Sequence, residues 1–387
     1  MRLFCIIILC FLFVPSCSKR ISDADDKDLD IIDEIEVFVD PVYLRAEEIV
    51  SLMDDRLLAA QLLISGIDGR ETLPSYVVNM LTEIPPGGIM LFRYNLNTDN
   101  DTIRDLLTRT KAVIRDESGI TPFIAVDHEG GAVNRFMRGV ASLPSASSYW
   151  EFFQSDGLDA ALEKIESDSH RAALVINDLG INMNFAPVAE YLTDDNRSFL
   201  ANRSYGHDPV FTARASYAFI RGMEKAGVLC VVKHFPGSAG DDPHYSKSTL
   251  NLKGGELDVL VSPFIYLIEK GTRAIMAAHT LTSALDSEIA SLSPVVMRNW
   301  LRDGLGFNGI IISDDFIMAA AGSSSPEQAA VKSIAAGSDM ILVWPANLEK
   351  THSAIISALE DKSLSRERLI NAVQRIIYEK LKLGLMD

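Results

Sequence analysis

The stretch VLCVVKHFPGSAGDDPH, residues 228–244, begins as an apolar run rich in β-branched residues and ends in titratable ones. A continuous apolar run of this length is typical of a strand that is buried on both faces of a parallel sheet. Lys233 and His234 end the run, and a Gly/Pro loop with Asp242 and His244 follows. Such residues at the carboxyl end of a strand are typical of an active site on a parallel α/β barrel, although acidic loops are also common on protein surfaces.

Similar apolar runs recur along the chain and alternate with amphipathic stretches, giving eight strand candidates, each followed by a helix candidate. This alternation predicts an α/β fold with a single closed (β/α)8 barrel of the TIM type and no second domain. The predicted strands are 61–66, 87–92, 122–127, 181–187, 228–234, 274–279, 309–315 and 339–344. The helix signals include 102–115, 157–179, 208–226, 256–269, 294–304, 326–336 and a long terminal segment over 349–383.

The carboxyl ends of barrel strands converge on one face, where catalysis occurs. Asp127 has a simpler alternative role as a cap of the following turn, and His279 has one as a hydrogen-bonded core histidine. Asp314 follows a strongly apolar run, which predicts a buried carboxylate, and a buried charge is costly unless it is paired or used. The predicted strand ends carry Arg93, Asp127 with Glu129, Asn184, Lys233 with His234, His279, Asp314 with Asp315, and Trp344.

Composition argues against several other functions. The 387-residue chain has a formal net charge of −17 and no basic tract, so nucleic acid is not an expected partner. Its seven histidines include no His-x-His pair, so we expect no metal site and no cofactor. Only Cys230 lies outside the N-terminal leader, so no disulfide is expected within the mature domain if the leader is removed or its last cysteine is modified.

The first residues have the pattern of a targeting segment. Arg2 precedes the apolar run LFCIIILCFLFV, which is too short to span a bilayer comfortably, and VPSC at 14–17 follows. This pattern resembles a bacterial lipoprotein signal, which implies removal of residues 1–16 and lipid attachment to Cys17. An ordinary signal peptide cleaved nearby is the alternative, and either one would export the protein.

The predicted location is therefore the cell envelope, where a lipid anchor would be the only link to a bacterial membrane. Residues 17–44 are mostly acidic and lack a helical apolar face, which predicts a tether. The barrel domain is predicted over 45–387.

Five segments resemble the barrel domain of family 3 glycoside hydrolases, and most of all the bacterial β-N-acetylglucosaminidase branch. They occur in the order typical of that family and cover essentially the whole mature domain, which is expected to be a single-domain member. The segments are VDHEGGAVNRF (126–136), ANRSYGHDP (201–209), VVKHFPG (231–237), MAAHTLTSALD (276–286) and LGFNGIIISDDFIMAA (305–320).

The resemblance implies a two-step mechanism. Asp314, the first acid of ISDD, matches the nucleophile that forms a covalent glycosyl-enzyme intermediate, so the anomeric configuration would be retained. His244 and Asp242 match the dyad that acts as general acid/base in this branch. An imidazole suits both roles because its pKa lies near neutrality, and the neighbouring carboxylate would orient the ring.

The resemblance also implies the residues that bind the sugar. Asp127 matches a carboxylate that accepts hydrogen bonds from sugar hydroxyls, and Arg203, Lys233 and His234 match donors to them. Glu129 and Arg135 are expected to support these groups. Trp344 could stack on a sugar face or simply pack.

The resemblance is weakest in the dyad loop, which is shorter than is usual for the branch and has Ser238 where a histidine is expected. Asp241 is an alternative partner for His244. We expect a retaining exo-β-N-acetylglucosaminidase that hydrolyses terminal β-linked N-acetylglucosamine from cell-wall fragments, chitin oligomers or glycoconjugates. The alternatives are a non-catalytic sugar-binding lipoprotein on the same barrel and another family 3 glycosidase or phosphorylase.

Overall fold

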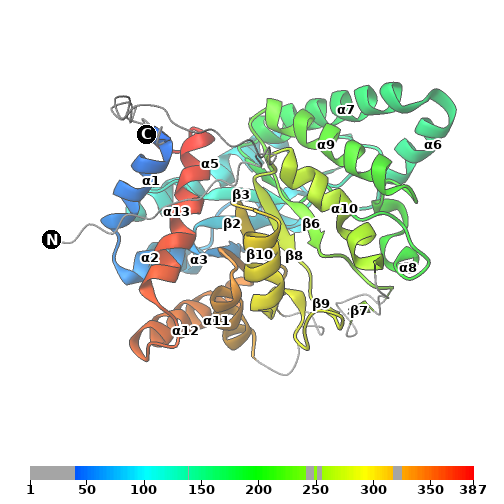
Figure 1. Cartoon of the computed structure of the whole chain (residues 1–387). Coiled ribbons are helices and arrows are strands. Elements are labelled where there is room, and N and C mark those ends of the chain that lie inside the picture. Colours follow the sequence, from blue (N-terminus) through cyan, green and yellow to red (C-terminus); the bar gives the residue numbers. More distant parts are fainter. Residues whose placement is uncertain (1–39, 138, 241–247, 251–254, 317–324) are drawn as a thin grey trace, which may run out of the picture. The chain divides into compact units, whose positions relative to one another are not determined.

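The computed structural model of the chain describes residues 40–387 apart from 138, 241–247, 251–254 and 317–324. Parallel strands at its centre form a nine-stranded, nearly closed, barrel-like sheet (Figure 1). The order in this sheet is β5 (Leu229–Cys230), β4 (Met183–Asn184), β3 (Phe123–Val126), β2 (Gly88–Leu91), β1 (Leu63–Gly66), β11 (Met340–Val343), β10 (Ile310–Ser313), β8 (Ala274–Ala277) and β6 (Val232–Phe235).

The two strands at the ends of this order are neighbours in the chain. Only Val231 separates β5 from β6, and both lie in the predicted strand 228–234. The pairing of β6 with β8 shifts register between Val232 and Phe235. Each of the eight predicted strands is therefore present, the fifth as two short segments, and the α/β prediction is confirmed.

The predicted helices are also present up to residue 336. Two of them have terminal residues that are typical of helices: Asp208 caps α9 by accepting a hydrogen bond from Val210, and Gly119 ends α5 with a left-handed φ of 73°. The helices are α5 (Asn100–Ser118), α7 (Leu158–Asp178), α9 (Pro209–Lys225), α10 (Glu256–Glu269), a π-helix over Val295–Gly304, and α11 (Pro326–Ala336). Further helices are α2 (Asp55–Gln61), α3 (Ser75–Glu83), α4 (Arg93–Leu96), α6 (Ala146–Asp156) and α8 (Arg197–Leu200), and a small parallel sheet pairs β7 (Ser248–Leu250) with β9 (Thr280–Thr282).

The prediction of one long terminal helix is wrong, because two helices, α12 (Leu348–Glu360) and α13 (Arg366–Lys382), occupy this segment. Lys362 between them has a φ of 65°, which a right-handed helix does not allow. Ser365 then caps α13, since its hydroxyl accepts a hydrogen bond of 3.2 Å from the Arg368 amide. Local turn chemistry therefore outweighs the continuous apolar pattern.

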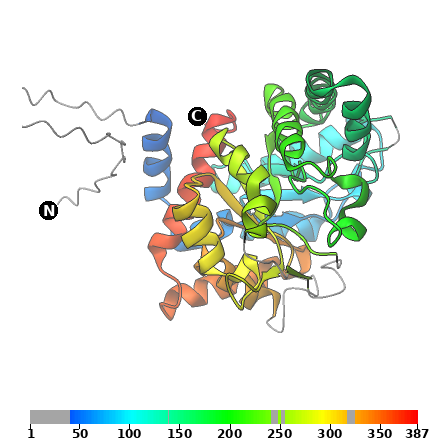
Figure 2. The ribbon, with the colours of Figure 1, turned by 45° about the vertical axis from the view of Figure 1, so that its right-hand side comes forward.

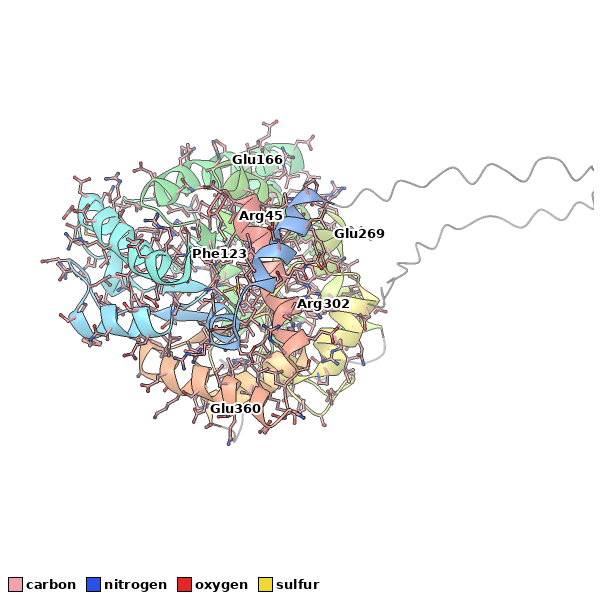
Figure 3. The ribbon with its side chains drawn as sticks, turned by 90° about the vertical axis from the view of Figure 1, so that its left-hand side faces the viewer. Arg45, Phe123, Glu166, Glu269, Arg302 and Glu360 are labelled. Atoms are coloured by element: carbon pink, nitrogen blue, oxygen red, sulfur yellow. The ribbon has the colours of Figure 1, made fainter. Side chains whose placement is uncertain are left out.

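The compact unit begins at Asp40 rather than at residue 45. Helix α1 (Pro41–Ser51) packs beside α13 (Figure 2), and the Tyr378 hydroxyl donates to Asp40 over 2.8 Å. Figure 3 shows this side of the molecule, with Arg45 on α1 and Phe123 of β3. Across the part of the chain that the structure describes, none of the helices has the length and apolar character needed to cross a membrane.

Apolar side chains fill the interior of the sheet, as in other barrels with few strands. They come from alternate positions of the strands and include Ile64, Met90, Phe123, Met183, Leu229, Met276, Ile310 and Met340. At the amino ends of the strands, the fully buried Lys380 of α13 lies over the Phe123 ring, with its Nζ 5.2 Å from the ring centroid. The amino end of the barrel-like sheet is therefore covered, and polar groups gather at the carboxyl end.

Candidate active site

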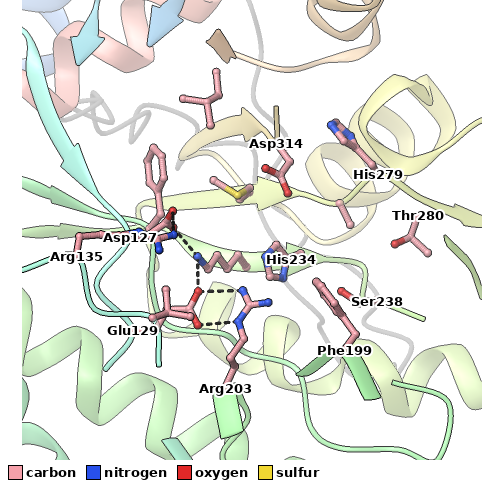
Figure 4. Close-up of a pocket in the computed structure, with 16 residues that line it drawn as sticks. Asp127, Glu129, Arg135, Phe199, Arg203, His234, Ser238, His279, Thr280 and Asp314 are labelled. Atoms are coloured by element: carbon pink, nitrogen blue, oxygen red, sulfur yellow. Dashed lines mark hydrogen bonds and ion pairs between the residues drawn. The ribbon is translucent and has the colours of Figure 1, made fainter. Parts of the chain in front are cut away.

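A pocket of about 210 Å³ opens at the carboxyl ends of the strands (Figure 4). Asp127, Ala278 and Asp314 directly follow β3, β8 and β10, and Lys233 and His234 lie within β6, in keeping with the barrel rule. The pocket is lined by Asp127, Glu129, Val133, Arg135, Phe185, Phe199, Arg203, Lys233, His234, Ser238, Met276, Ala278, His279, Thr280, Asp314 and Leu342.

Five of these side chains form a continuous chain of alternating charges. The Lys233 ammonium donates to Asp127 Oδ1 over 2.8 Å and pairs with Glu129 Oε1 at 2.7 Å. Arg203 holds both oxygens of Glu129, through Nε at 2.8 Å and Nη2 at 2.9 Å. Arg135 Nη2 lies 3.3 Å from Asp127 Oδ2. Three cations thus flank two carboxylates, and the group carries a net positive charge.

Electrostatics keep this group ionised. Burial by itself would raise the pKa of Asp127, but the charges of Lys233 and Arg135 outweigh it and hold the pKa below its usual value. In the same way, Lys233 and Arg203 depress the pKa of Glu129. Burial would lower the pKa of Lys233, whereas Asp127 and Glu129 raise it. Asp127, Glu129 and Lys233 are therefore charged at neutral pH and ready to hydrogen-bond with a polar ligand.

Glu190, which the sequence analysis did not single out, organises the other side of the pocket. Its carboxylate is buried and accepts from His234 Nδ1 over 2.7 Å, from the His234 amide over 3.1 Å and from the Ser238 amide over 2.5 Å. Burial would raise the pKa of Glu190, and the bonds from His234 and Ser238 hold it low. Because Nδ1 donates to Glu190, Nε2 is the nitrogen that His234 can offer to a ligand. Extending the strand-end rule a few residues past 181–187 would have found Glu190.

Asp314 lies one residue past the end of β10 and faces the charged group across the pocket (Figure 4). The prediction that this carboxylate is buried is wrong: it is half-buried, because the pocket exposes the end of the strand. Its Oδ1 accepts a hydrogen bond of 2.9 Å from the Asp315 amide. Within the described residues no basic side chain forms an ion pair with Asp314, so its carboxylate is open to a ligand.

His279 lines the pocket but is held by the surrounding structure. Its Nδ1 lies 2.7 Å from the Ser291 hydroxyl, and Nε2 lies 3.0 Å from the Asp315 carbonyl oxygen, to which it donates. The ring also stacks on Phe316 at 4.8 Å. The alternative of a hydrogen-bonded core histidine is therefore confirmed, at the edge of the pocket.

Four strand-end residues do not line this pocket: Arg93, Asn184, Asp315 and Trp344. Arg93 donates to the Asn134 carbonyl oxygen over 2.8 Å. Asn184 exchanges two hydrogen bonds of 2.9 Å with the backbone of His128. The Trp344 indole donates to the Asp315 carboxylate and stacks on Phe92 at 4.9 Å.

Asp127, Arg203, Lys233, His234 and Asp314 are therefore all brought together in one pocket. Glu129 and Arg135 line the same pocket, in contact with the residues that they were expected to support.

The predicted dyad, Asp242 with His244, lies outside the described residues, and so do Asp241 and Cys17. Ser238, which precedes this segment, lines the pocket. Its neighbour Ala239 donates to the hydroxyl of Ser248, just beyond the segment, over 3.2 Å. Among the residues that the structure describes, no group of three or more His, Cys, Asp or Glu side chains could hold a metal ion.

Comparison with protein families gives a match to the glycosyl hydrolase family 3 N-terminal domain over residues 58–378. The chain is 33% identical over 288 residues to a β-hexosaminidase of Methylococcus capsulatus, covering 72% of this chain and 81% of that one. It is 35% identical over 280 residues to a β-hexosaminidase of Chromobacterium violaceum, covering 70% of this chain and 75% of the relative.

Solved structures show the same likeness. A glycoside hydrolase family 3 β-N-acetylglucosaminidase from Paenibacillus sp. superimposes with a TM-score of 0.80 at 28% identity, covering 86% of this chain and 63% of that one. NagZ from Neisseria gonorrhoeae, solved with N-trifluoroacetyl-D-glucosamine, superimposes with a TM-score of 0.69 at 26% identity and covers 84% and 98% of the two chains.

Proposed function

Since the chain belongs to glycosyl hydrolase family 3 and is a glycoside hydrolase, we propose that it is a retaining exo-β-N-acetylglucosaminidase. Its substrates would carry a terminal β-linked N-acetylglucosamine, as cell-wall fragments, chitin oligomers and glycoconjugates do. The observation that carries the proposal is the position of the half-buried Asp314 carboxylate, which faces the charged group around Lys233 across one pocket. Two kinds of comparison support the choice of sugar: the relatives are β-hexosaminidases, and NagZ binds an N-acylated glucosamine derivative.

In the proposed mechanism the charged group holds the sugar. Asp127 accepts hydrogen bonds from hydroxyl groups, Lys233 and Arg203 donate to them, and His234 hydrogen-bonds to them through Nε2. Asp314 attacks the anomeric carbon, and the bond to the leaving-group oxygen breaks as that oxygen takes a proton from His244. Water then loses a proton to His244 and attacks the same carbon, which releases Asp314 and the sugar with its original configuration.

The size of the pocket supports exo action. Its volume of about 210 Å³ is below the roughly 300–1,000 Å³ of pockets that enclose drug-sized ligands, so it suits one sugar unit rather than an oligosaccharide. We also infer that the sheet is a complete (β/α)8 barrel, because β5 and β6 are parts of one strand that would close it.

Substrate and stereochemistry can be tested together. We expect turnover of an aryl β-N-acetylglucosaminide to exceed that of the matching β-glucoside and β-xyloside, because the relatives act on hexosamines. Proton NMR of the reaction should show the β-anomer of N-acetylglucosamine first. An α-anomer as first product would contradict retention, and a sugar phosphate formed only when phosphate is present would identify a phosphorylase. Sugar binding by calorimetry without turnover of any glycoside would identify a binding protein.

We further propose export and lipid attachment at Cys17, on the support of the sequence pattern at residues 1–17. Cells that express the full chain should incorporate labelled palmitate into the protein and retain it in the membrane fraction. Cys17→Ser should abolish both, whereas Cys230→Ser, which changes a buried thiol, should affect neither. Palmitate incorporation into the Cys17→Ser variant would refute the assignment.

A further inference from the structure

We propose that three aromatic rings beside the pocket bind the first sugar ring of the leaving group. Phe92, Tyr94 and Trp344 are together called the aromatic platform below. This inference rests on the proposed function, since a leaving group exists only if the enzyme cleaves a glycosidic bond. It gives the enzyme a second carbohydrate subsite and a preference for sugars over small leaving groups.

The rings of the platform are nearly parallel. Phe92 stacks on Trp344 with a centroid distance of 4.9 Å and an angle of 11°, and on Tyr94 at 6.1 Å and 7°. The indole N–H of Trp344 donates to the Asp315 carboxylate, which fixes the orientation of the ring. Tyr94 is 42% exposed and Trp344 is 38% exposed, so a ligand can reach both.

The backbone is shaped to bring these rings together. Phe92 follows β2 and Trp344 follows β11, and β1 lies between these two strands in the sheet. β1 ends at Gly66, where an added Cβ would lie only 3.1 Å from Phe92 Cε2 and 3.2 Å from Pro345 Cδ. A glycine at this point therefore lets Phe92 and the segment of Trp344 approach each other closely.

The platform adjoins the catalytic pocket through two residues. Arg135 lines both the pocket and the outer hollow that Phe92, Arg93, Tyr94 and Asn97 form. Inside the pocket the same guanidinium lies 3.3 Å from Asp127, which is placed to bind the terminal sugar. Trp344 is held by Asp315, the neighbour of the nucleophile. A ligand that extends from the pocket past Arg135 would reach the hollow formed by Phe92 and Tyr94.

The chemistry of the hollow fits a sugar ring. The faces of a sugar are lined with C–H groups that pack on aromatic rings, while its hydroxyls need hydrogen-bond partners at the edge. The exposed Arg93 lines the same hollow as Phe92 and Tyr94 and supplies such donors. An exo-enzyme encloses the terminal sugar, so the next sugar must rest at the mouth of the pocket. Exposed aromatic rings beside a hollow that shares Arg135 with the pocket therefore point to a leaving group of this kind.

Two substrates isolate this contact. N,N′-diacetylchitobiose has a sugar as its leaving group, whereas N-acetylglucosaminyl β-fluoride loses only fluoride, which is too small to reach the platform. Trp344→Leu and Tyr94→Ala should each lower kcat/KM for the disaccharide about tenfold and change that for the fluoride less than about twofold. Trp344→Phe, which keeps a ring but loses the bond to Asp315, should lie closer to the wild type.

Tyr43→Ala on α1 is the matched control, because Tyr43 is a comparably exposed tyrosine outside both hollows. An equal loss of kcat/KM on both substrates, or no loss on the disaccharide, would contradict the proposal that the platform binds the leaving group. If the wild type turned over neither substrate, the proposed function would fail instead. Calorimetry would then test the aromatic platform. The wild type should bind the disaccharide more tightly than N-acetylglucosamine, and the Trp344→Leu variant should bind both equally.

Discussion

Asp314→Asn is expected to lower kcat/KM for an aryl β-N-acetylglucosaminide by at least about a thousandfold, because an amide cannot form the glycosyl-enzyme ester. Folding should be unaffected, since the half-buried carboxylate makes no ion pair among the described residues and an amide oxygen can still accept the Asp315 hydrogen bond. Initial rates with purified protein, together with a thermal melt, test both statements.

Two comparisons make this result specific. Asp105→Asn on α5 changes an exposed carboxylate in the same way and should leave the rate unchanged. His244→Ala should slow natural glycosides far more than aryl glycosides, because an activated leaving group needs no proton. Equal activity of Asp314→Asn and wild type would exclude Asp314 as nucleophile. Equal losses on both leaving groups in His244→Ala would remove His244 as acid.

Lys233→Met should be the most damaging change to the binding side of the pocket. It leaves the half-buried Asp127 and the buried Glu129 carboxylates facing each other without the buried cation that lies 2.8 and 2.7 Å from them. Removing one partner of a buried charge network costs about 3–5 kcal/mol of stability. We therefore expect a large drop in the free energy of unfolding, measured by urea denaturation at pH 7, and a strong rise in KM.

The direction in which the free energy of unfolding changes with pH follows from the lowered pKa values of Asp127 and Glu129. In the wild type the folded state holds fewer protons on these groups than the unfolded chain does. Their favourable contribution is present above the unfolded pKa of about 4 and is lost as the pH falls through the folded values. Without Lys233 a large part of this contribution is lost, although Arg135 and Arg203 remain, so the deficit of the variant should be largest at pH 7 and smaller near pH 4.

Lys225→Met provides the matched control. Lys225 pairs with Glu166, but its side chain is 54% exposed, so the loss should stay within about 1 kcal/mol. A deficit for Lys233→Met that did not shrink toward pH 4 would show that lost packing, rather than the loss of the cation shared by two carboxylates, causes the instability.

The α/β class, the eight strand positions and the convergence of Asp127, Arg203, Lys233, His234 and Asp314 on one pocket could be read from the sequence. Apolar runs of strand length alternate with helical patterns, and strand ends in such a fold meet on one face. The boundary between α12 and α13 was missed because it depends on a single left-handed residue and a serine cap. Glu190 was missed because it lies beyond a strand end, in a segment without a motif.

Sequence by itself determined which residue types stand at the ends of which strands, since hydrophobic periodicity is a local property of the chain. Only the tertiary structure decided their partners. Lys233 lies between carboxylates 106 and 104 positions away, Glu190 holds His234, and Trp344 contacts Phe92 and Asp315. These partners come from different strands and loops, so they meet only when the sheet forms. Burial then makes an unpaired charge costly, and each buried charge is stable only beside a group of opposite charge or a hydrogen-bond partner.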